Sequence, residues 1–373
     1  MKTNEKTIYL LRHAEPLHAG NSRRCVGLTD VPITDYGRRE AGKLKTWFRD
    51  KGIRRIYTSP LKRCRQTAEM IADGQMEVIP MEGLHEMEVG QWENMTFREI
   101  REKYPKEYEE RGKNLGYYAP PGGESFQQAG LRFSESLKPV LDGAEDAIVV
   151  AHGGVNRGFV CLQQGISFNQ VMNIPQPYAG INVIKESEEG IHFEKIGYKP
   201  SAFLDREEMG RLFQKYQTSE PVKRHMEAVA DFLGRMVDHL EKSGETDWRS
   251  GWDAASAKDI LIQSALVHDL VRDRKCHAIE GAKVLRSAGY EEIADLVEVH
   301  HGLPDREWEI LSPKSLLFYA DKRVMEDSVV SLDERFQASR VKCKCREAFD
   351  KHERLYMQSV EIEKRLRLSG FKQ

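Results

Sequence analysis

The sequence lacks any apolar run long enough to span a bilayer, and its first residues lack the hydrophobic segment of a secretion signal. It also lacks low-complexity tracts and internal repeats, so we expect a chain that is globular throughout. The net charge is only −2, from 57 basic and 59 acidic residues, and gives no global field that would attract nucleic acid. These absences predict a cytoplasmic protein with neither a membrane nor a nucleic acid as its partner.

Cysteine is scarce and scattered, with six residues among 373. Such usage does not indicate the disulfide framework of a small secreted domain. The pair that lies closest in the sequence, Cys343 and Cys345, is closer together than the paired ligands of zinc ribbons. We therefore expect reduced thiols.

The length and the hydrophobic pattern indicate two domains. Single cores generally stop growing beyond roughly 250 residues, and this chain has 373. Short apolar strands alternate with amphipathic helices in the first half, whereas after Pro200 the strands cease and apolar residues follow the helical period. We predict a three-layer α/β domain with a mostly parallel sheet over residues 1–204, and an all-α helical bundle over residues 205–373.

Individual elements follow from the same pattern. The continuous apolar run at 147–151 is typical of a parallel strand that is buried on both faces. The other expected strands cover residues 8–11, 55–58, 180–184 and 191–196. The expected helices cover residues 36–51, 60–71, 221–240, 260–271, 278–285 and 316–324, and a charged helix packs on the bundle over 343–368.

Polar side chains follow two of the expected parallel strands. Arg12 and His13 come directly after the first strand, and His152 comes directly after the buried run. The carboxyl ends of parallel strands face the crevice where open α/β sheets bind ligands, so the two histidines can face each other. Attack on a phosphoryl group needs an unprotonated imidazole nitrogen, cations around the phosphate oxygens and an acid for the leaving oxygen. Arg12, His13, Arg63 and His152 can supply the first two requirements.

Seven short motifs follow one another in order across about the first 200 residues. They are Leu11-Arg12-His13, the segments 27–34 and 57–63, Leu84-His85-Glu86, the segments 90–93 and 122–125, and Ala151-His152-Gly153. Together they resemble the histidine phosphatase family, which includes phosphoglycerate mutases. The resemblance implies an α/β fold that needs no metal, and a transient phosphoryl group on His13.

The resemblance also implies roles for the residues around His13. Arg12, Arg63, His152 and Gly153 would surround the phosphate, and Glu86 would donate a proton to the leaving group. Glu88 lies close enough in the sequence to be the competing acid.

Two positions depart from the family pattern. In many members a glycine follows the nucleophile and an asparagine lies six positions after it, whereas Ala14 and Ala19 occupy those places here.

The stretch between Trp92 and Gly122 is modest in length and highly charged, which favours a phosphatase over a mutase with its longer insertions.

A second group of candidate site residues lies in the helical half. Its members are histidines and aspartates that are candidate metal ligands: His225, His268, Asp269, His277, His300, His301 and Asp321. Imidazole and carboxylate ligands suit Mn, Fe, Co, Ni or Zn, and a carboxylate between two sites can bridge two ions. Residues spread over successive helices converge only in the core of a bundle, so we expect inward-facing ligands.

The order of these residues, with the segment 265–270 as the closest match, resembles the HD superfamily of metal-dependent phosphohydrolases over about residues 216–330. The resemblance implies a divalent transition metal, as one or two ions. The first ion would be held by His225, His268, Asp269 and Asp321. The second would be surrounded by Asp269, His277, His300 and His301.

The helical half also departs from its family pattern. Leu270-Val271-Arg272 replaces the usual Ile-Gly-Lys, and Arg272 is a permanent cation that substitutes poorly for lysine in proton transfer. The segment 301–304 lacks the Gly-Tyr-Pro signature of cyclic-dinucleotide hydrolases. We therefore do not expect that substrate.

Both resemblances predict a bifunctional phosphohydrolase that acts on a small phosphorylated metabolite or nucleotide. The first domain would be a phosphomonoesterase, and the second a metal-dependent hydrolase or phosphodiesterase acting on a nucleotide-like or cyclic phosphate. Three alternatives stay open: a regulatory, ligand-sensing second domain, a di-iron oxygenase in its place, and a mutase in the first domain. The sequence leaves the oligomeric state open as well.

Overall fold

The structure is a computed structural model that describes residues 6–17, 24–187, 190–200, 203–244, 248, 254–304, 306–341, 343–368 and 370–371. Ala19, and with it the position of the family's asparagine, lies outside the described residues. The chain divides into two compact units, Met1–Lys199 and Pro200–Gln373. The sequence-based boundary between residues 204 and 205 stays a prediction.

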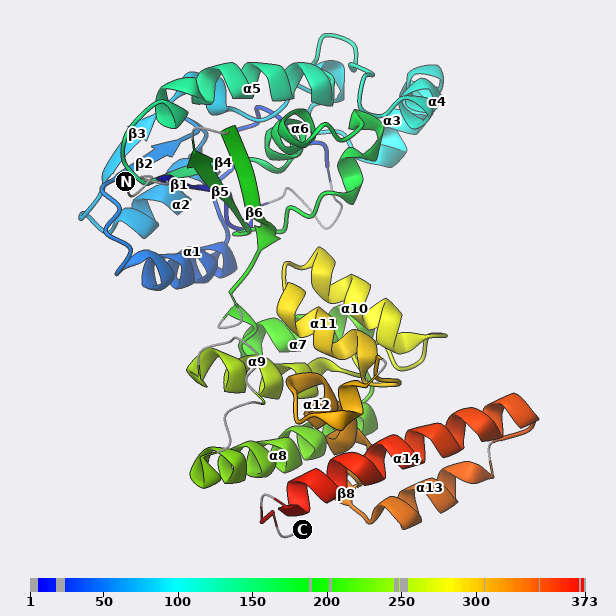
Figure 1. The fold of residues 1–373 in the computed structure, drawn as a ribbon. Helices are drawn as coiled ribbons and strands as arrows, with labels where there is room; N and C mark the ends of the chain where they lie inside the picture. The colour runs from blue at the N-terminus through cyan, green and yellow to red at the C-terminus, as the bar shows by residue number, and fades with distance from the viewer. Residues whose placement is uncertain are drawn as a thin grey trace. The chain divides into compact units, whose positions relative to one another are not determined.

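The first unit is built on a six-stranded sheet in the order β3-β2-β4-β1-β5-β6 (Figure 1). The first four strands in this order are parallel, and β5 and β6 are antiparallel to their neighbours. This confirms the predicted α/β fold with a mostly parallel sheet. The strands are β1 (Lys6–Arg12), β2 (Arg55–Thr58), β3 (Glu77–Pro80), β4 (Ala147–Ala151), β5 (Ile181–Ser187) and β6 (Gly190–Tyr198).

Helices cover both faces of this sheet. Figure 1 shows α5 and α6 on one face and α1 and α2 on the other. The helices are α1 (Asp35–Phe48), α2 (Lys62–Ala72), α3 (Phe97–Lys103), α4 (Pro105–Lys113), α5 (Phe126–Leu141) and α6 (Gly153–Gln164). The start of α5 is fixed by a capping box, because Ser125 Oγ accepts the Gln128 N–H while the Gln128 side chain accepts the Ser125 N–H.

Strand β4 lies at the centre of the sheet, as its apolar run predicts. All five of its residues are buried, and the strand pairs in parallel with both β1 and β2. The β1–β4 register places Arg12 opposite Ala151. The residues that follow the two strands, His13 and His152, therefore begin at the same edge of the sheet.

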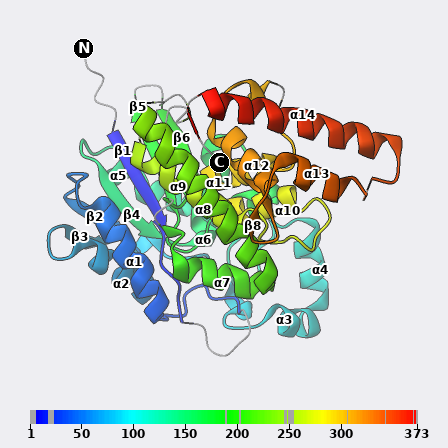
Figure 2. The same ribbon diagram turned by 90° about the horizontal axis from the view of Figure 1, so that it is seen from below.

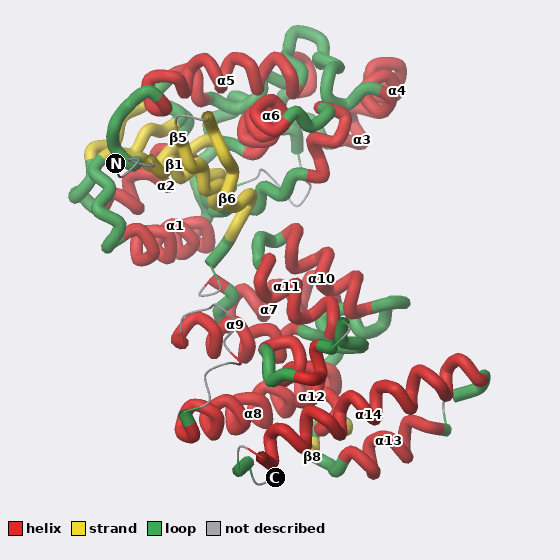
Figure 3. The backbone as a smooth tube through the Cα atoms, in the orientation of Figure 1, coloured by secondary structure: helices red, strands yellow, loops and turns green. Residues whose placement is uncertain are grey.

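The second unit is helical, which confirms the predicted bundle (Figure 3). Its helices are α7 (Arg206–Tyr216), α8 (Glu220–Ser243), α9 (Ala254–Val267), α10 (His277–Ser287), α11 (Glu291–Val299), α12 (Pro313–Arg323), α13 (Leu332–Arg340) and α14 (Arg346–Leu368). Figures 1 and 2 both show α13 and α14 side by side. None of the described helices is long and apolar enough to cross a membrane.

Two expectations for this half are wrong in detail. Strands do not cease after Pro200, because β7 (Val324–Met325) and β8 (Ser328–Val329) form a short hairpin. Glu326 adopts a left-handed backbone conformation with φ of 56° at the turn between them. The helix expected over 260–271 ends at Val267, and the one expected over 316–324 ends at Arg323.

Candidate functional site

His13 and His152 meet at the carboxyl ends of β1 and β4. Their rings lie edge to face with centroids 5.2 Å apart, and the His13 ring is buried. His13 Nδ1 lies 2.8 Å from the Ala14 carbonyl oxygen, so this nitrogen carries the proton and donates it. When Nδ1 carries the proton, Nε2 is the ring nitrogen that can attack a phosphoryl group.

His152 is fully buried, and both of its ring nitrogens contact protein groups. Nδ1 accepts a hydrogen bond from Arg63 Nε at 3.1 Å, and Nε2 lies 2.8 Å from Ser59 Oγ. Burial, assisted by the Arg63 charge, holds the pKa of His152 well below its usual value. The ring is therefore neutral at pH 7.

Two arginines lie beside the histidines. Arg63 donates from its terminal nitrogens to the carbonyl oxygens of Thr29 at 2.8 Å and Gly27 at 2.7 Å, which fixes the guanidinium in place. Arg12 stacks over the Tyr178 ring at 3.9 Å. Arg12 Nε is buried and makes no hydrogen bond within the described part of the chain. A buried donor of this kind is the feature that a phosphate oxygen would satisfy.

Glu86 points its carboxylate at the start of α6. Its oxygens accept the backbone N–H groups of Gly154 at 3.0 Å and Val155 at 3.1 Å. A Cβ on Gly154 would lie 2.5 Å from Glu86 Oε1, so the glycine makes room for the acid. The backbone N–H of Glu88, the competing acid, donates to Glu124 Oε2 at 3.1 Å, and the Glu88 carbonyl oxygen accepts the Glu124 N–H at 2.7 Å.

Arg157 is a residue near this site that the sequence reasoning missed. It lies one helical turn after Gly153, and its guanidinium donates to the Gly153 carbonyl oxygen at 3.2 Å. Burial and the neighbouring Arg12 charge lower the pKa of Arg157 to about 10, so it remains a cation at pH 7. The signal was its spacing of four residues from Gly153, which puts both on one face of α6.

The structure brings together all seven predicted metal ligands of the second unit. His225 in α8 and Asp321 in α12 lie well inside helices. The others lie at helix ends: His268 and Asp269 follow α9, His277 starts α10, and His300 and His301 follow α11. Because His277 is the first residue of α10, the expectation of ligands inside successive helices is wrong for four of the seven.

One group of ligands surrounds Asp321 and one oxygen of Asp269. Asp321 Oδ1 lies 3.1 Å from His225 Nε2 and 3.5 Å from His268 Nε2. Asp269 Oδ2 lies 3.5 Å from His268 Nε2 and 3.9 Å from His225 Nε2. Four side chains thus direct ligand atoms at one small volume.

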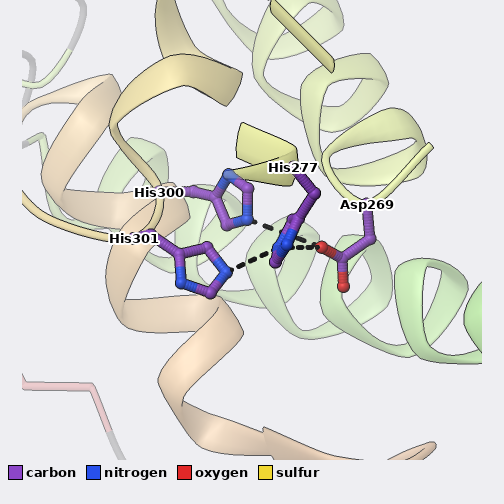
Figure 4. A group of neighbouring side chains, drawn as sticks. All are labelled: Asp269, His277, His300 and His301. Carbon is purple, nitrogen blue, oxygen red and sulfur yellow. Dashed lines mark hydrogen bonds and ion pairs between the residues drawn. The ribbon is translucent and has the colours of Figure 1, made fainter. Parts of the chain in front are cut away.

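A second group surrounds the other oxygen of Asp269 (Figure 4). Asp269 Oδ1 lies 3.0 Å from His277 Nε2 and 3.6 Å from His300 Nε2. His277 Nε2 in turn lies 2.8 Å from His301 Nε2. Asp269 therefore has one oxygen in each group, which is the arrangement that a bridging carboxylate needs.

The backbone orients three of the imidazoles. His225, His268 and His300 place Nδ1 within 2.8 Å of the carbonyl oxygens of Glu326, Ala265 and Val297. A ring that donates Nδ1–H to a carbonyl presents the Nε2 lone pair, as metal-binding histidines do. His268 Nε2 and His300 Nε2 are buried and make no hydrogen bond among the described residues, so the donor set fits a metal ion.

Both carboxylates of this centre are ionised. Burial raises the pKa of Asp321, but the adjacent Lys322 ammonium lowers it further, and the net pKa lies well below the usual value. Burial likewise raises the pKa of Asp269, while the His268 ring and other neighbours hold it below the usual range. Asp269 also contacts Arg272, and Lys322 Nζ lies 2.5 Å from Asp321 Oδ2. The centre thus holds two negative charges that attract cations.

A family model described as the histidine phosphatase superfamily (branch 1) matches residues 8–199. The chain belongs to the histidine phosphatase superfamily. A second family model, described as the HD domain, matches residues 222–335. Both resemblances seen in the sequence are therefore confirmed, in the predicted order along this histidine phosphatase chain.

Curated relatives are similar to about two fifths of this chain. The human 6-phosphofructo-2-kinase/fructose-2,6-bisphosphatase 3 is 34% identical over 157 residues, which are 41% of this chain and 28% of the relative. The enzyme of that name from Gallus gallus is 33% identical over 160 residues, or 41% of this chain and 31% of the relative. The chain thus spans about three tenths of the length of the curated relatives it matches.

Solved structures are similar to about half of this chain. Bacillus stearothermophilus YhfR is 27% identical with a TM-score of 0.47, covering 51% of this chain and 95% of that chain. The alpha-ribazole phosphatase from Shigella flexneri is 21% identical with a TM-score of 0.47, covering 51% of this chain and 96% of that chain.

Proposed function

We propose that this protein is a bifunctional phosphohydrolase with two chemically independent active sites. The first is a phosphomonoesterase that works through phosphohistidine on His13. The second is a metal-dependent phosphohydrolase centred on Asp269. The observation that carries the proposal is the presence of two sets of positioned groups. In one, His13 lies beside a buried Arg12 Nε that has no acceptor among the described residues, and in the other, buried imidazole nitrogens surround an ionised aspartate.

In the first step, His13 Nε2 attacks the phosphorus of the monoester. The N–P bond forms as the bond from phosphorus to the ester oxygen breaks, and Glu86 gives its proton to the departing oxygen. Arg12 and Arg63 stabilise the charge that spreads over the equatorial oxygens. The neutral His152 and the fixed loop around Arg63 keep these groups in place.

In the second step, water attacks the phosphoryl group on His13. The Glu86 carboxylate takes a proton from this water, the O–P bond forms and the N–P bond breaks. Inorganic phosphate leaves, and His13 and Glu86 return to their starting states. We assign the acid–base role to Glu86 rather than Glu88 because its carboxylate lies at the start of α6, directly after His152.

In the second domain, His225, His268, Asp269 and Asp321 would hold one divalent transition-metal ion, and Asp269, His277, His300 and His301 a second. Such ions polarise a phosphoryl oxygen and lower the pKa of bound water. The protein orients its imidazoles through the backbone carbonyls of Glu326, Ala265 and Val297. It also keeps the two buried carboxylates ionised, so that they can bind cations.

We infer a small phosphorylated metabolite or nucleotide as the substrate class. The curated relatives carry fructose-2,6-bisphosphatase in their names, which supports a monoester of this size for the first domain. Three guanidinium groups, those of Arg12, Arg63 and Arg157, lie around His13 and His152, which also suits an anionic substrate.

Hydrolysis of p-nitrophenyl phosphate and bis(p-nitrophenyl) phosphate tests both sites in one protein. Wild type, His13→Ala and Asp269→Ala are each assayed with EDTA and with added manganese, and their bound metal is measured by mass spectrometry. His13→Ala should abolish the monoesterase that persists in EDTA. Asp269→Ala should remove bound metal and manganese-dependent diester cleavage, and leave the monoesterase intact.

Matched controls are available for both variants. His192, an exposed histidine of β6, and Asp273, an exposed aspartate four residues after Asp269, lie outside both sites. Their alanine variants should retain both activities. If monoester cleavage survives His13→Ala, the phosphohistidine mechanism is wrong. If the protein binds manganese but never cleaves a diester or another phosphate ester with it, the second domain is not the proposed hydrolase.

A further inference from the structure

A cavity of about 460 Å³ lies directly beside the candidate metal centre in the second unit. It is bounded by the first turn of α8, the turn between β7 and β8, and α13. His225 lines it and also belongs to the metal-ligand set. Its volume falls within the range of pockets that bind small ligands.

The wall of this cavity is rich in arginine. Arg224, Arg272 and Arg335 come from three different segments of the fold and all line it. Two acidic side chains, Glu326 and Asp327, lie on the same wall. Arg224 Nε lies 3.7 Å from Asp327 Oδ2, which is a loose ion pair between exposed groups.

Arg335 has no such partner. Its Nε is buried and makes no hydrogen bond in the part of the chain that is described. A buried guanidinium donor without an acceptor costs free energy that an anion in the cavity would recover. Arginine also presents paired donors that match phosphate geometry.

Residues that line the cavity also contact the candidate metal ligands. The turn at Glu326 lines the cavity, and its left-handed backbone directs the Glu326 carbonyl to His225 Nδ1. Arg272 lines the cavity and contacts Asp269. A molecule held in the cavity is therefore next to the ligand atoms of the centre.

We propose that this cavity is an anion subsite of the metal centre, in which Arg335 and Arg224 bind a second phosphate group of the substrate. The inference rests on the proposed hydrolase function of the second domain and narrows its substrate class. The preferred substrate carries another phosphate beyond the one that is cleaved, as nucleoside polyphosphates do. A simple diester without that group lacks this interaction.

The first test measures binding without metal. Inorganic pyrophosphate is titrated calorimetrically into the full-length chain in EDTA, with Arg12→Gln in every protein to weaken the phosphate site of the first domain. Arg335→Gln and Arg224→Gln should each weaken the affinity about tenfold or more, since hydrogen bonds to charged groups contribute about 1.5–3 kcal/mol. Arg340→Gln on α13 and Arg235→Gln on α8 lie outside the cavity wall and should leave the affinity unchanged.

The second test measures catalysis with manganese. Arg335→Gln should raise the KM for a nucleoside triphosphate about tenfold and leave the KM for bis(p-nitrophenyl) phosphate unchanged. Arg335→Lys keeps the charge but loses the paired donors, and should fall between wild type and Arg335→Gln in both tests. Thermal unfolding verifies that each variant is folded.

The two tests distinguish failure of the anion subsite from failure of the proposed hydrolase function. Wild-type pyrophosphate affinity in folded Arg335→Gln and Arg224→Gln would overturn the anion subsite, even if the manganese-dependent hydrolase is real. If no ester is hydrolysed with manganese but pyrophosphate binding still depends on Arg335 and Arg224, the subsite stands and the proposed hydrolase fails.

Discussion

Replacing Gly154 by alanine should impair the monoesterase without unfolding the protein. The added Cβ would lie 2.5 Å from Glu86 Oε1, whereas ordinary contacts begin near 3.4 Å. The carboxylate is the end of a flexible side chain, so it yields by about 1 Å rather than the backbone. A misplacement of about 1 Å in a catalytic group costs on the order of 10²-fold in rate. We therefore expect kcat to fall about 100-fold.

The stability of this variant should change little. Alanine in a helix is about 0.5–1 kcal/mol more favourable than glycine, which offsets part of the cost of moving Glu86. Gly42 in α1 is the matched control, because a Cβ there meets no atom within 4 Å. Gly42→Ala should keep wild-type kinetics, and urea denaturation should show both variants folded.

Comparing substrates with good and poor leaving groups tests the role of Glu86 more directly. An acid assists a poor leaving group more than a good one, so Gly154→Ala should slow phenyl phosphate more than p-nitrophenyl phosphate. In a Glu86→Gln background, Gly154→Ala should cost nothing further, because both changes remove the same interaction. A Gly154→Ala enzyme with wild-type kcat on phenyl phosphate would refute the assignment of Glu86. The same loss in a Glu86→Gln background, with none in a Glu88→Gln background, would refute it as well.

Two further predictions concern the stability of the first unit. Lys199→Met should lower the free energy of unfolding in urea by about 3 kcal/mol, because Lys199 Nζ lies 3.0 Å from Glu40 Oε1 and both groups are buried. Adding Glu40→Gln should recover most of this loss. A Lys199→Met variant with the free energy of unfolding of wild type would contradict the role of the pair. The pKa of His152 is lower in the folded protein than in the unfolded chain. Below about pH 6.5 the unfolded chain therefore takes up a proton at His152 that the folded protein does not, and the free energy of unfolding of wild type should fall with the pH. His152→Gln should flatten this dependence between about pH 6.5 and 5 in the same assay, and an equal slope would contradict it.

The parts of the fold that the sequence predicted have strong local signals. The five apolar residues of β4 are buried on both faces, so hydrophobicity alone identified a central strand. Parallel pairing of β1 with β4 then brings His13 and His152 together whatever their separation along the chain. The order of motifs was enough to identify both families, although the motifs of the second lie partly inside helices, as His225 and Asp321 do.

The errors have physical causes as well. The apolar period of α9 continues through Leu270 and Val271, which are buried although the helix has ended at Val267. These two residues of a turn are apolar because they are buried, so the apolar spacing of the helix continues past its end. The sequence pattern therefore predicted that the ligand His268 lies inside a helix. The hairpin of β7 and β8 has two residues in each strand, too few for an alternating pattern.

Side-chain contacts between distant segments have no signal in a single sequence. Arg335 and His225 are 110 positions apart, and they line one cavity because α13, the β7–β8 turn and the start of α8 all border it. Arg157 was missed for a different reason: the family motif that drew attention to this region ends at Gly153. The cation one turn further on becomes visible only when α6 is built as a helix.

The two candidate sites hold charge in opposite ways, and under the proposed functions we expect this difference to set the order in which they act on a diester. The His13 site offers fixed cations to a phosphoryl group that carries two negative charges, and a diester has only one. The Asp269 site offers negative charges to metal ions, which can activate water towards a diester. We therefore expect wild type with manganese to convert bis(p-nitrophenyl) phosphate into two equivalents of p-nitrophenol and one of phosphate. His13→Ala should stop after one equivalent and accumulate p-nitrophenyl phosphate, as phosphorus NMR of the mixture can show. Full release of phosphate by His13→Ala would mean that the metal site cleaves monoesters too, and that the order of reactions is not set by charge.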